Sequence, residues 1–346
     1  MTNLEVLPQE EVCPPAHDGA GTGPCLQLWP AREVPLGGVR AMKVSRTLPQ
    51  RGLPTVGAWC FLDSFGPERV AMSVLPHPHT GLQTVTWPLQ GTIRHRDSVG
   101  SDVLVRPGEL NIMTAGRGVS HSEFAVLPDA VAAGTDGPVS GQLPLERGLQ
   151  LWVALPEGER HRAPAFEQHR KLPQVTGEGY TGTVMVGSFA GATSPATMFS
   201  PIVGVDLEGS GSMTLPLNPD FEHAVLVLDG GLTLDGQEVP PGPLGYLGKG
   251  RGSLELEALP GSRFILLGGE PFEEELLMWW NFVGRTHAEI EQFRRDWEDQ
   301  AGLADSAAAS APYGLVRGHG PEAGREAGRI PAPPLPGVQL RPRRRF

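Results

Sequence analysis

The chain is short of basic residues and of cysteine, which argues against two classes of protein. Its 346 residues contain 28 Lys and Arg against 39 Asp and Glu, a formal net charge of −11. Because phosphate contacts need clustered Lys and Arg, we expect no direct binding of nucleic acid. The one basic run, residues 341–345, is interpreted as part of a solvated terminus. Cys13, Cys25 and Cys60 lack the Cys-x-x-Cys spacing of metal sites, so we predict reduced thiols and no disulfide framework.

Long apolar runs and the common catalytic motifs are also missing. No segment approaches the length of a membrane span and the first residues are acidic, so we expect no membrane contact and a cytoplasmic protein. The sequence has no Gly-x-Ser-x-Gly elbow, no Gly-x-x-x-x-Gly-Lys phosphate loop and no dinucleotide fingerprint after a strand. Serine-hydrolase, nucleotide-hydrolysing and dinucleotide-binding functions are therefore not supported.

Two short histidine motifs, His77-Pro78-His79 and His121-Ser122-Glu123, are present instead. In a β-strand, residues i and i+2 point to the same face, so each motif aims two ligands into one space. Three imidazoles and one carboxylate suit a first-row divalent metal, and they leave coordination positions open for water, oxygen or a chelating substrate. In the alternative interpretation, the first two histidines are turn residues beside a proline and His121 is a satisfied surface or core residue.

A strand is predicted directly after the first motif. Over residues 84–91, odd positions are apolar and even positions are mostly polar, the alternation of a half-buried strand. If the register is unbroken, His77 and His79 share the parity of Val85 and Trp87, and this face is predicted to point into the barrel. The proline between the histidines and a glycine that follows them are the positions at which the register can break.

The two halves of the chain repeat the same pattern. The first has strand, Gly91, strand and then Pro107-Gly108; the second has an apolar hairpin over residues 224–234 and then Pro241-Gly242. With 46 glycines, 35 prolines and enough hydrophobic residues (39%) for two small cores, this indicates duplicated β-barrels of the jelly-roll type. Near the second hairpin stands only His223, for which we predict a structural role in a metal-free domain.

A helix is predicted after the second barrel. Residues 286–289, Thr-His-Ala-Glu, form a capping box, and an apolar stripe at helical spacing should dock on a barrel; its members are Ile290, Phe293 and Trp297. Beyond about residue 301 the chain is rich in alanine, glycine and proline, with an extended polyproline-like segment at 331–336. This tail either wraps over the protein or stays mobile.

Six segments of the sequence together resemble the pirins. All but the last resemble the N-terminal cupin of that family, and the last resembles the C-terminal segment of bacterial pirins. The matching segments are residues 77–86, 95–98, 107–109, 113–123, 149–156 and 278–285. The resemblance spans roughly residues 26 to 300 and implies an all-β chain of two tandem cupin (jelly-roll β-barrel) domains, a bicupin, with a short C-terminal helix and an extended tail. It divides the chain into an N-terminal extension (1–25), a metal-binding cupin (26–165), a metal-free cupin (166–285), a helix (286–300) and a tail (301–346).

The resemblance also implies a metal centre. Carried over residue by residue, the family's ligands fall on His77, His79, His121 and Glu123. Near the place of the usual cupin glutamate of the first motif stand Gln83 and Thr84, interpreted as supporting residues. The implied ion is Fe(II), although Mn, Co, Ni, Cu and Zn suit the same donors.

The activity implied is that of a metal-dependent dioxygenase acting with dioxygen on quercetin or a related enol or flavonol. Glu123 is the candidate catalytic residue, since it either tunes the metal as a ligand or accepts the enol proton as a general base. In a second interpretation, taken from animal pirins and from bacterial relatives that bind metabolic enzymes, the chain is an iron-binding, redox-sensitive regulatory protein that binds a transcription factor or metabolic enzyme without turnover. In a third, flavonol cleavage is incidental and the natural substrate is an unrelated small enol.

Overall fold

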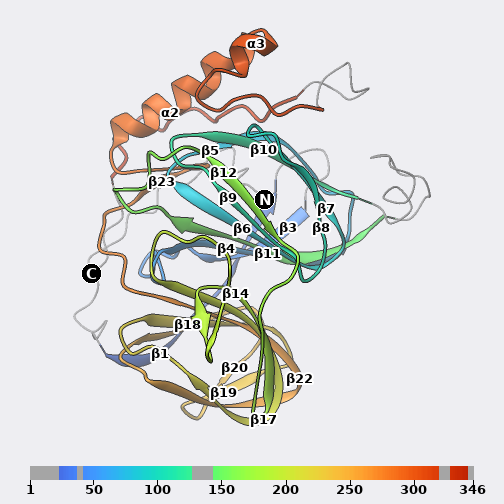
Figure 1. Ribbon diagram of the computed structural model, residues 1–346. Coiled ribbons are helices and arrows are strands. Elements are labelled where there is room, and N and C mark those ends of the chain that lie inside the picture. The colour runs from blue at the N-terminus through green and yellow to red at the C-terminus, as the bar shows by residue number, and fades with distance from the viewer. Residues whose placement is uncertain (1–22, 37–41, 127–142, 319–327, 342–346) are drawn as a thin grey trace.

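A computed structural model of the chain describes residues 23–36, 42–126, 143–318 and 328–341 (Figure 1). Cys13, most of the N-terminal extension 1–25 and the basic residues that follow Arg341 lie outside these ranges. Two β-barrels are stacked one on the other, and a helix crosses the far end of the first (Figure 1). The predicted all-β, two-barrel chain with a short C-terminal helix is confirmed.

The first barrel is built from a 7-stranded and a 4-stranded antiparallel sheet. Its strands are β2 (Arg32–Leu36), β3 (Met42–Leu48), β4 (Trp59–Arg69), β5 (Ser73–His79), β6 (Leu82–Gln90), β7 (Ile93–Asp97), β8 (Asp102–Val105), β9 (Leu110–Thr114), β10 (Val119–Ala125), β11 (Leu145–Ala154) and β12 (Ala165–His169). The larger sheet has the order β12-β9-β6-β11-β4-β3-β2 and the smaller one β5-β10-β7-β8. Cys60 is a buried free thiol in β4, and Cys25 is free as well, as the sequence predicts.

The second barrel is a 9-stranded sheet with a small hairpin beside it. Its strands are β1 (Pro24–Trp29), β13 (Gln174–Gly177), β14 (Tyr180–Val186), β17 (Ile202–Pro216), β18 (Glu222–Asp229), β19 (Leu232–Leu234), β20 (Gln237–Val239), β21 (Leu244–Lys249) and β22 (Ser253–Gly269), and the hairpin is β15 (Ser188–Phe189) with β16 (Ala192–Thr193). Gly230 (φ +73°) takes the turn from β18 to β19, as Gly91 (φ +87°) takes the turn from β6 to β7. Both turns need a left-handed backbone, which glycine adopts without steric cost.

Strand pairing differs from the predicted domain limits at two places. β1, most of which falls within the predicted first domain, pairs with β21 of the second barrel. β12, most of which falls within the predicted second domain, pairs with β9 of the first. A strand near the boundary of two domains pairs with whichever sheet edge it can reach, because its backbone N–H and C=O groups need partners. Sequence motifs do not reveal which edge that is.

The face of β6 that was predicted to point into the barrel points out of it. Trp87 donates from Nε1 to Asp206 Oδ2 of β17 (2.8 Å), whereas Thr86 lies on the other face and donates from Oγ1 to Gln150 Oε1 (3.0 Å). β5 and β6 belong to different sheets, and the turn between them, with Gly81 at φ +69°, breaks the register. The apolar face of β6 therefore packs on the second barrel, and its polar face lines the interior of the first.

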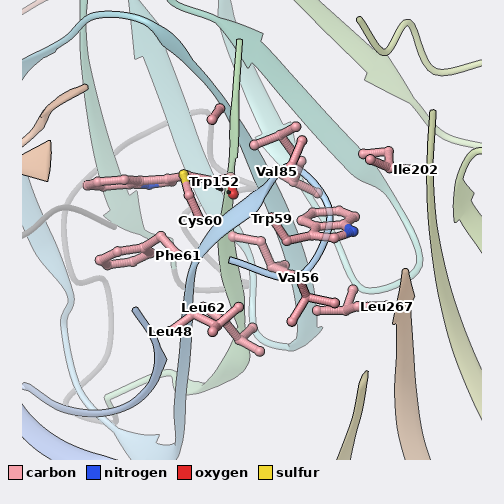
Figure 2. Packing of buried hydrophobic residues seen from close by; sticks show 14 of the residues in the cluster. Leu48, Val56, Trp59, Cys60, Phe61, Leu62, Val85, Trp152, Ile202 and Leu267 are labelled. Carbon is pink, nitrogen blue, oxygen red and sulfur yellow. Dashed lines mark hydrogen bonds between the residues drawn. The ribbon is translucent and has the colours of Figure 1, made fainter. Parts of the chain in front are cut away.

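One continuous apolar core joins the two barrels. Figure 2 shows Trp59 and Val85 of the first barrel beside Ile202 and Leu267 of the second. The indole Nε1 of Trp59 lies 3.2 Å from the carbonyl oxygen of Val203, so this buried ring is also tied across the interface by a hydrogen bond. Full burial of large side chains stabilises by about 1.5–3 kcal/mol each, so the barrels form one packed body.

The C-terminal elements cover the far end of the first barrel. They are β23 (Leu277–Trp279), β24 (Phe282–Gly284), α2 (His287–Asp299), the 3-10 turn η1 (Gln300–Gly302) and α3 (Asp305–Ala308). The predicted capping box is present, with Glu289 N donating to Thr286 Oγ1. Ile290 and Trp297 are buried, and Trp297 packs edge-on against Tyr313 (5.5 Å). No helix among the described residues is long and apolar enough to cross a membrane.

The described part of the tail, residues 301–318 and 328–341, lies over the strands that carry the histidine motifs. Ser120 N of β10 donates to the carbonyl oxygen of Tyr313 (3.0 Å), and Ile330 N donates to that of Pro76 in β5 (2.8 Å). These bonds tie tail backbone to both strands, so the residues next to His77 and His121 are each held by the tail.

Candidate metal centre

The four predicted ligands come from two neighbouring strands of the small sheet. His77 and His79 belong to β5, and His121 and Glu123 belong to β10. His121 lies opposite His77 in the register, and a register shift separates His121 from Glu123. All four side chains are at most 1% exposed, inside the first barrel.

The three imidazoles converge. Each of His77, His79 and His121 offers a ring nitrogen within 4.8 Å of the other two, and the Nε2 atoms of His79 and His121 are 3.1 Å apart. Two nitrogens bound at about 2.1 Å and at right angles on one ion are about 3 Å apart, so this spacing fits a shared metal.

Backbone carbonyls set the direction of two of the rings. His77 Nδ1 lies 2.9 Å from the carbonyl oxygen of Leu75, and His79 Nδ1 lies 3.2 Å from that of Asn281. A carbonyl can only accept, so each Nδ1 carries the proton and each Nε2 presents a lone pair. The buried Nε2 of His77 has no hydrogen-bond partner among the described residues, which is the state expected of a metal-binding atom.

The electrostatics of the centre favour neutral imidazoles. Burial lowers the pKa of His77 to about 3 and holds the pKa values of His79 and His121 well below the ordinary value, with neighbouring imidazoles adding to the effect on these two. The pKa of Glu123 lies below its ordinary value, even though its burial acts to raise it. At neutral pH the centre therefore offers free nitrogen lone pairs and an ionised carboxylate.

His95 belongs to the same cluster, although it is not among the ligands predicted from the sequence. It forms a second potential metal-binding group with His121 and Glu123, and it lies directly opposite Glu123 in the register of β7 and β10. Its Nε2 is 3.0 Å from Asp97 Oδ2, and its ring stacks on Phe166 at 4.6 Å. The sequence signal for His95 is His-x-Asp at strand spacing, the same i, i+2 pattern as in the two predicted ligand motifs.

A column of stacked groups forms one wall of the centre. The ring of Trp152 meets that of His79 edge-on at 5.1 Å and stacks on Phe61 at 4.0 Å. The guanidinium of Arg46 lies over Phe61 at 4.4 Å and is paired with the buried carboxylate of Asp63. This wall excludes water on one side of the histidines and lowers the local dielectric, which strengthens the electrostatic interactions inside.

In the second barrel, aliphatic residues occupy the positions of this centre. The end of β17 pairs with the start of β22 as β5 pairs with β10, and β19 pairs with β22 as β7 pairs with β10. Where His77 faces His121, Leu215 faces Leu254; and where His95 faces Glu123, Leu234 faces Leu256. All four leucines are buried. The described part of the second barrel contains no group of three or more His, Cys, Asp or Glu side chains that could hold a metal.

Fold and site together define a class of protein: two tandem cupin barrels with the donor set for one divalent metal ion in the first. The chain matches the Pirin family over residues 40–153 and the Pirin C-terminal cupin domain over residues 202–301. It belongs to the pirin family.

Three similar proteins place it within that family. A putative quercetin 2,3-dioxygenase of Pseudomonas aeruginosa is 39% identical over 97% of this chain and 98% of its own length. A pirin-like protein of Caulobacter vibrioides is 34% identical over 74% of this chain and 88% of its own length. The crystal structure of quercetin 2,3-dioxygenase from Acinetobacter baumannii superposes with a TM-score of 0.79 at 37% identity, and the match covers 92% of this chain and 97% of that one.

Proposed function

We propose that the chain is a metal-dependent dioxygenase that acts on quercetin or a related enol or flavonol. The observation that carries the proposal is the convergence of three neutral imidazoles beside a buried carboxylate inside the first barrel. The two relatives named for quercetin 2,3-dioxygenase, which match nearly the whole chain, support the same substrate class.

We assign the metal to His77, His79, His121 and Glu123, with Fe(II) as the native ion. His95 is assigned a positioning role, because both of its ring nitrogens face protein groups: Nε2 lies 3.0 Å from Asp97 Oδ2 and Nδ1 lies 3.5 Å from His121 Nδ1. A side chain held in this way orients Glu123 and His121 beside it. The other three histidines are each directed to the centre by their strand, and two of them by a backbone carbonyl as well.

Glu123 is the group we expect to handle the proton. Its Oε1 lies 3.4 Å from Thr86 Oγ1, on the polar face of β6, and Thr86 itself donates to Gln150. When bound, the divalent ion would make an enol hydroxyl more acidic and provide the point at which substrate and dioxygen meet. The ionised carboxylate of Glu123 would leave the ion as substrate binds and would then accept the enol proton. Trp152 and the residues behind it keep water away, and the three histidines would keep hold of the ion.

An oxygen-uptake assay tests this function. Protein loaded with Fe(II) without air should consume dioxygen when quercetin is added, with loss of the flavonol's visible absorption band. Glu123→Gln, similar in shape but a poor base, should slow turnover by about 100-fold or more. Glu109→Gln, on the turn before β9, is a matched carboxylate control and should leave the rate unchanged.

The same assay separates the proposal from the regulatory alternative. Protein with a full complement of metal that consumes no dioxygen with any of several flavonols or small enols would contradict an oxygenase function. It would leave a metal-linked binding module for a transcription factor or metabolic enzyme. A cytoplasmic location stays a prediction in either case.

A further inference from the structure

The second barrel contains a cavity of about 520 Å³ that the metal centre does not use. Its wall is formed by the β15–β16 hairpin, the segment that leads from there into β17, the end of β17 and the start of β18. Cavities of 300–1,000 Å³ are the size that holds a small organic molecule.

Within the part of the chain that the structure describes, no charged residue lines this cavity. Apolar side chains such as Phe189, Met198 and Phe221 stand beside the polar ones, and no Asp, Glu, Lys or Arg is among them. An ionised ligand would lose its hydration here without gaining a counter-charge, so the cavity selects neutral molecules.

The wall includes one buried imidazole, that of His223, in which a ring nitrogen is available for a hydrogen bond. His223 is 1% exposed, and its Nδ1 has no hydrogen-bond partner among the described residues. Burial lowers the pKa of His223 to about 4, so the ring is neutral and can accept as well as donate. A buried polar atom left without a partner costs free energy, which a ligand hydroxyl would recover.

The position of His223 in the barrel explains why its ring stands in the wall. His223 stands as far before the hairpin glycine Gly230 as Thr84 stands before the hairpin glycine Gly91, so the two residues occupy matching places in β18 and β6. Thr84 lies on the face of β6 that lines the interior of the first barrel. Its partner in the register is Gly268, whereas the partner of Thr84 is Trp152. A Cβ on Gly268 would lie only 2.5 Å from His223 Cδ2, so the glycine gives the imidazole the room that the indole fills in the first barrel.

We propose that this cavity is a second small-molecule site, which binds a neutral aromatic ligand carrying a hydroxyl group and recognises that hydroxyl through His223. The aromatic and thioether side chains enclose the ring system. The site is independent of the reaction in the first barrel, since no residue of the metal centre contributes to its wall.

The experiment measures binding of 2-naphthol to the full chain by equilibrium dialysis at neutral pH, beside 2-methylnaphthalene, which lacks the hydroxyl, and 2-naphthoate, which is charged. We expect 2-naphthoate to bind at least about tenfold more weakly than 2-naphthol. His223→Phe should weaken 2-naphthol by about tenfold and leave 2-methylnaphthalene within about twofold. Ala196→Phe, which fills the cavity from its wall, should weaken both neutral probes by at least about tenfold. The exposed His161→Phe is the matched control and should change neither.

A metal-centre variant distinguishes the two barrels. His79→Ala should bind 2-naphthol like the wild type, and loss of binding in that variant would place the probe at the metal centre and overturn the proposal. So would an absence of binding to the wild type, or equal 2-naphthol affinity in the wild type and in folded Ala196→Phe. If Ala196→Phe does not fold, the affinities of His223→Phe for 2-naphthol and for 2-methylnaphthalene test the proposal by themselves. None of these measurements depends on turnover, so they stand or fall separately from the dioxygenase proposal.

Discussion

At the scale of single residues, the metal centre depends on backbone atoms as much as on the side chains it contains. The carbonyl of Asn281, which is 202 positions away from His79 in the chain, accepts from the ring of that histidine and turns its Nε2 inward. Trp280, just before it, has φ +54°, an uncommon conformation for a residue other than glycine. The C-terminal segment thus helps to set the tautomer of a predicted ligand in the N-terminal barrel.

Replacing His79 by Ala should remove the metal and leave the barrel folded. The pre-formed strands and their core contribute more to folding than one ligand does, so we expect the free energy of unfolding of metal-free protein to change by less than about 2 kcal/mol. Metal content by elemental analysis should fall well below one ion per chain, and oxygen uptake should be lost. His161→Ala, on the surface, is the control. Retention of full activity by His79→Ala would rule out the proposed ligand set.

A second prediction concerns Glu146, a buried carboxylate near the start of β11, an inner strand of the larger sheet. Burial raises its pKa to about 8, so the native state keeps this proton over a range in which the unfolded state, with a pKa near 4.5, has lost it. Protonated Glu146 therefore contributes fully to the free energy of unfolding below about pH 4.5, and this contribution is lost as the pH rises to about 8. The loss amounts to about 3–5 kcal/mol. Glu146→Gln mimics the protonated form and should remove this dependence.

Chemical denaturation at pH 5 and pH 9 measures the free energy of unfolding of the wild type and of each variant. Relative to the wild type, Glu146→Gln should gain stability at pH 9, whereas the exposed Glu68→Gln, which replaces its partner in the β4–β11 register, should track the wild type at both values. Parallel pH profiles of the wild type and Glu146→Gln would show that the carboxyl does not retain its proton.

At the scale of elements, α2 and the described tail act as a brace on the two strands that carry the histidines. The tail reaches β10 through Ser120 and β5 through Pro76, each next to a predicted ligand. Trp297 of α2 ties the two layers together, since its ring packs on Tyr313 and its Nε1 donates to Ile330 O (2.9 Å). The brace contacts the backbone of these strands, whereas the side chains of the predicted ligands are buried inside the barrel.

Trp297→Ala should therefore destabilise the protein without changing its metal content. Deleting a buried indole leaves a cavity and removes a hydrogen bond, at a cost of about 3–5 kcal/mol. Denaturation followed by circular dichroism measures the loss, and elemental analysis measures the metal. Leu303→Ala, at an exposed position just after η1, should change stability by less than about 0.5 kcal/mol. Loss of the metal from folded Trp297→Ala would contradict the separation of brace and centre.

At the scale of the whole molecule, one duplicated fold carries two different interiors. The first barrel has polar residues on the inner face of β6 and a cluster of histidines across from them, and the second has leucines at the matching strand positions. The barrels share a continuous core through Trp59, which hydrogen-bonds across the interface. The second barrel therefore supports the first by packing against its apolar outer face.

Metal analysis of the full chain tests this division. We expect close to one ion per chain in the wild type and almost none in the double variant His77→Ala/His121→Ala, because the leucine-filled positions of the second barrel offer no donor. The double variant Leu215→Ala/Leu254→Ala should bind as much metal as the wild type and serves as the control. Two ions per chain, or an ion retained by the histidine double variant, would contradict a metal-free second barrel.

Much of the fold and of the centre could be predicted from local patterns. The i, i+2 spacing of the histidine motifs, the capping box before α2 and the hairpin glycines Gly91 and Gly230 are interactions between residues close in the chain. Such patterns depend on backbone geometry that hardly changes with context, so the two barrels, the helix and the convergence of the three histidines followed from them.

What local patterns cannot settle is which side of an amphipathic strand meets which partner. The sequence by itself determined that β6 has an apolar and a polar face, but only the tertiary structure decided that Trp87 faces Asp206 of the second barrel while Thr86 faces the interior. The same holds for the pairing of β1 with the second barrel and for His95 beside Glu123. Each depends on contacts between residues far apart in the chain, and the free energy of those contacts exists only once the strands concerned are packed together.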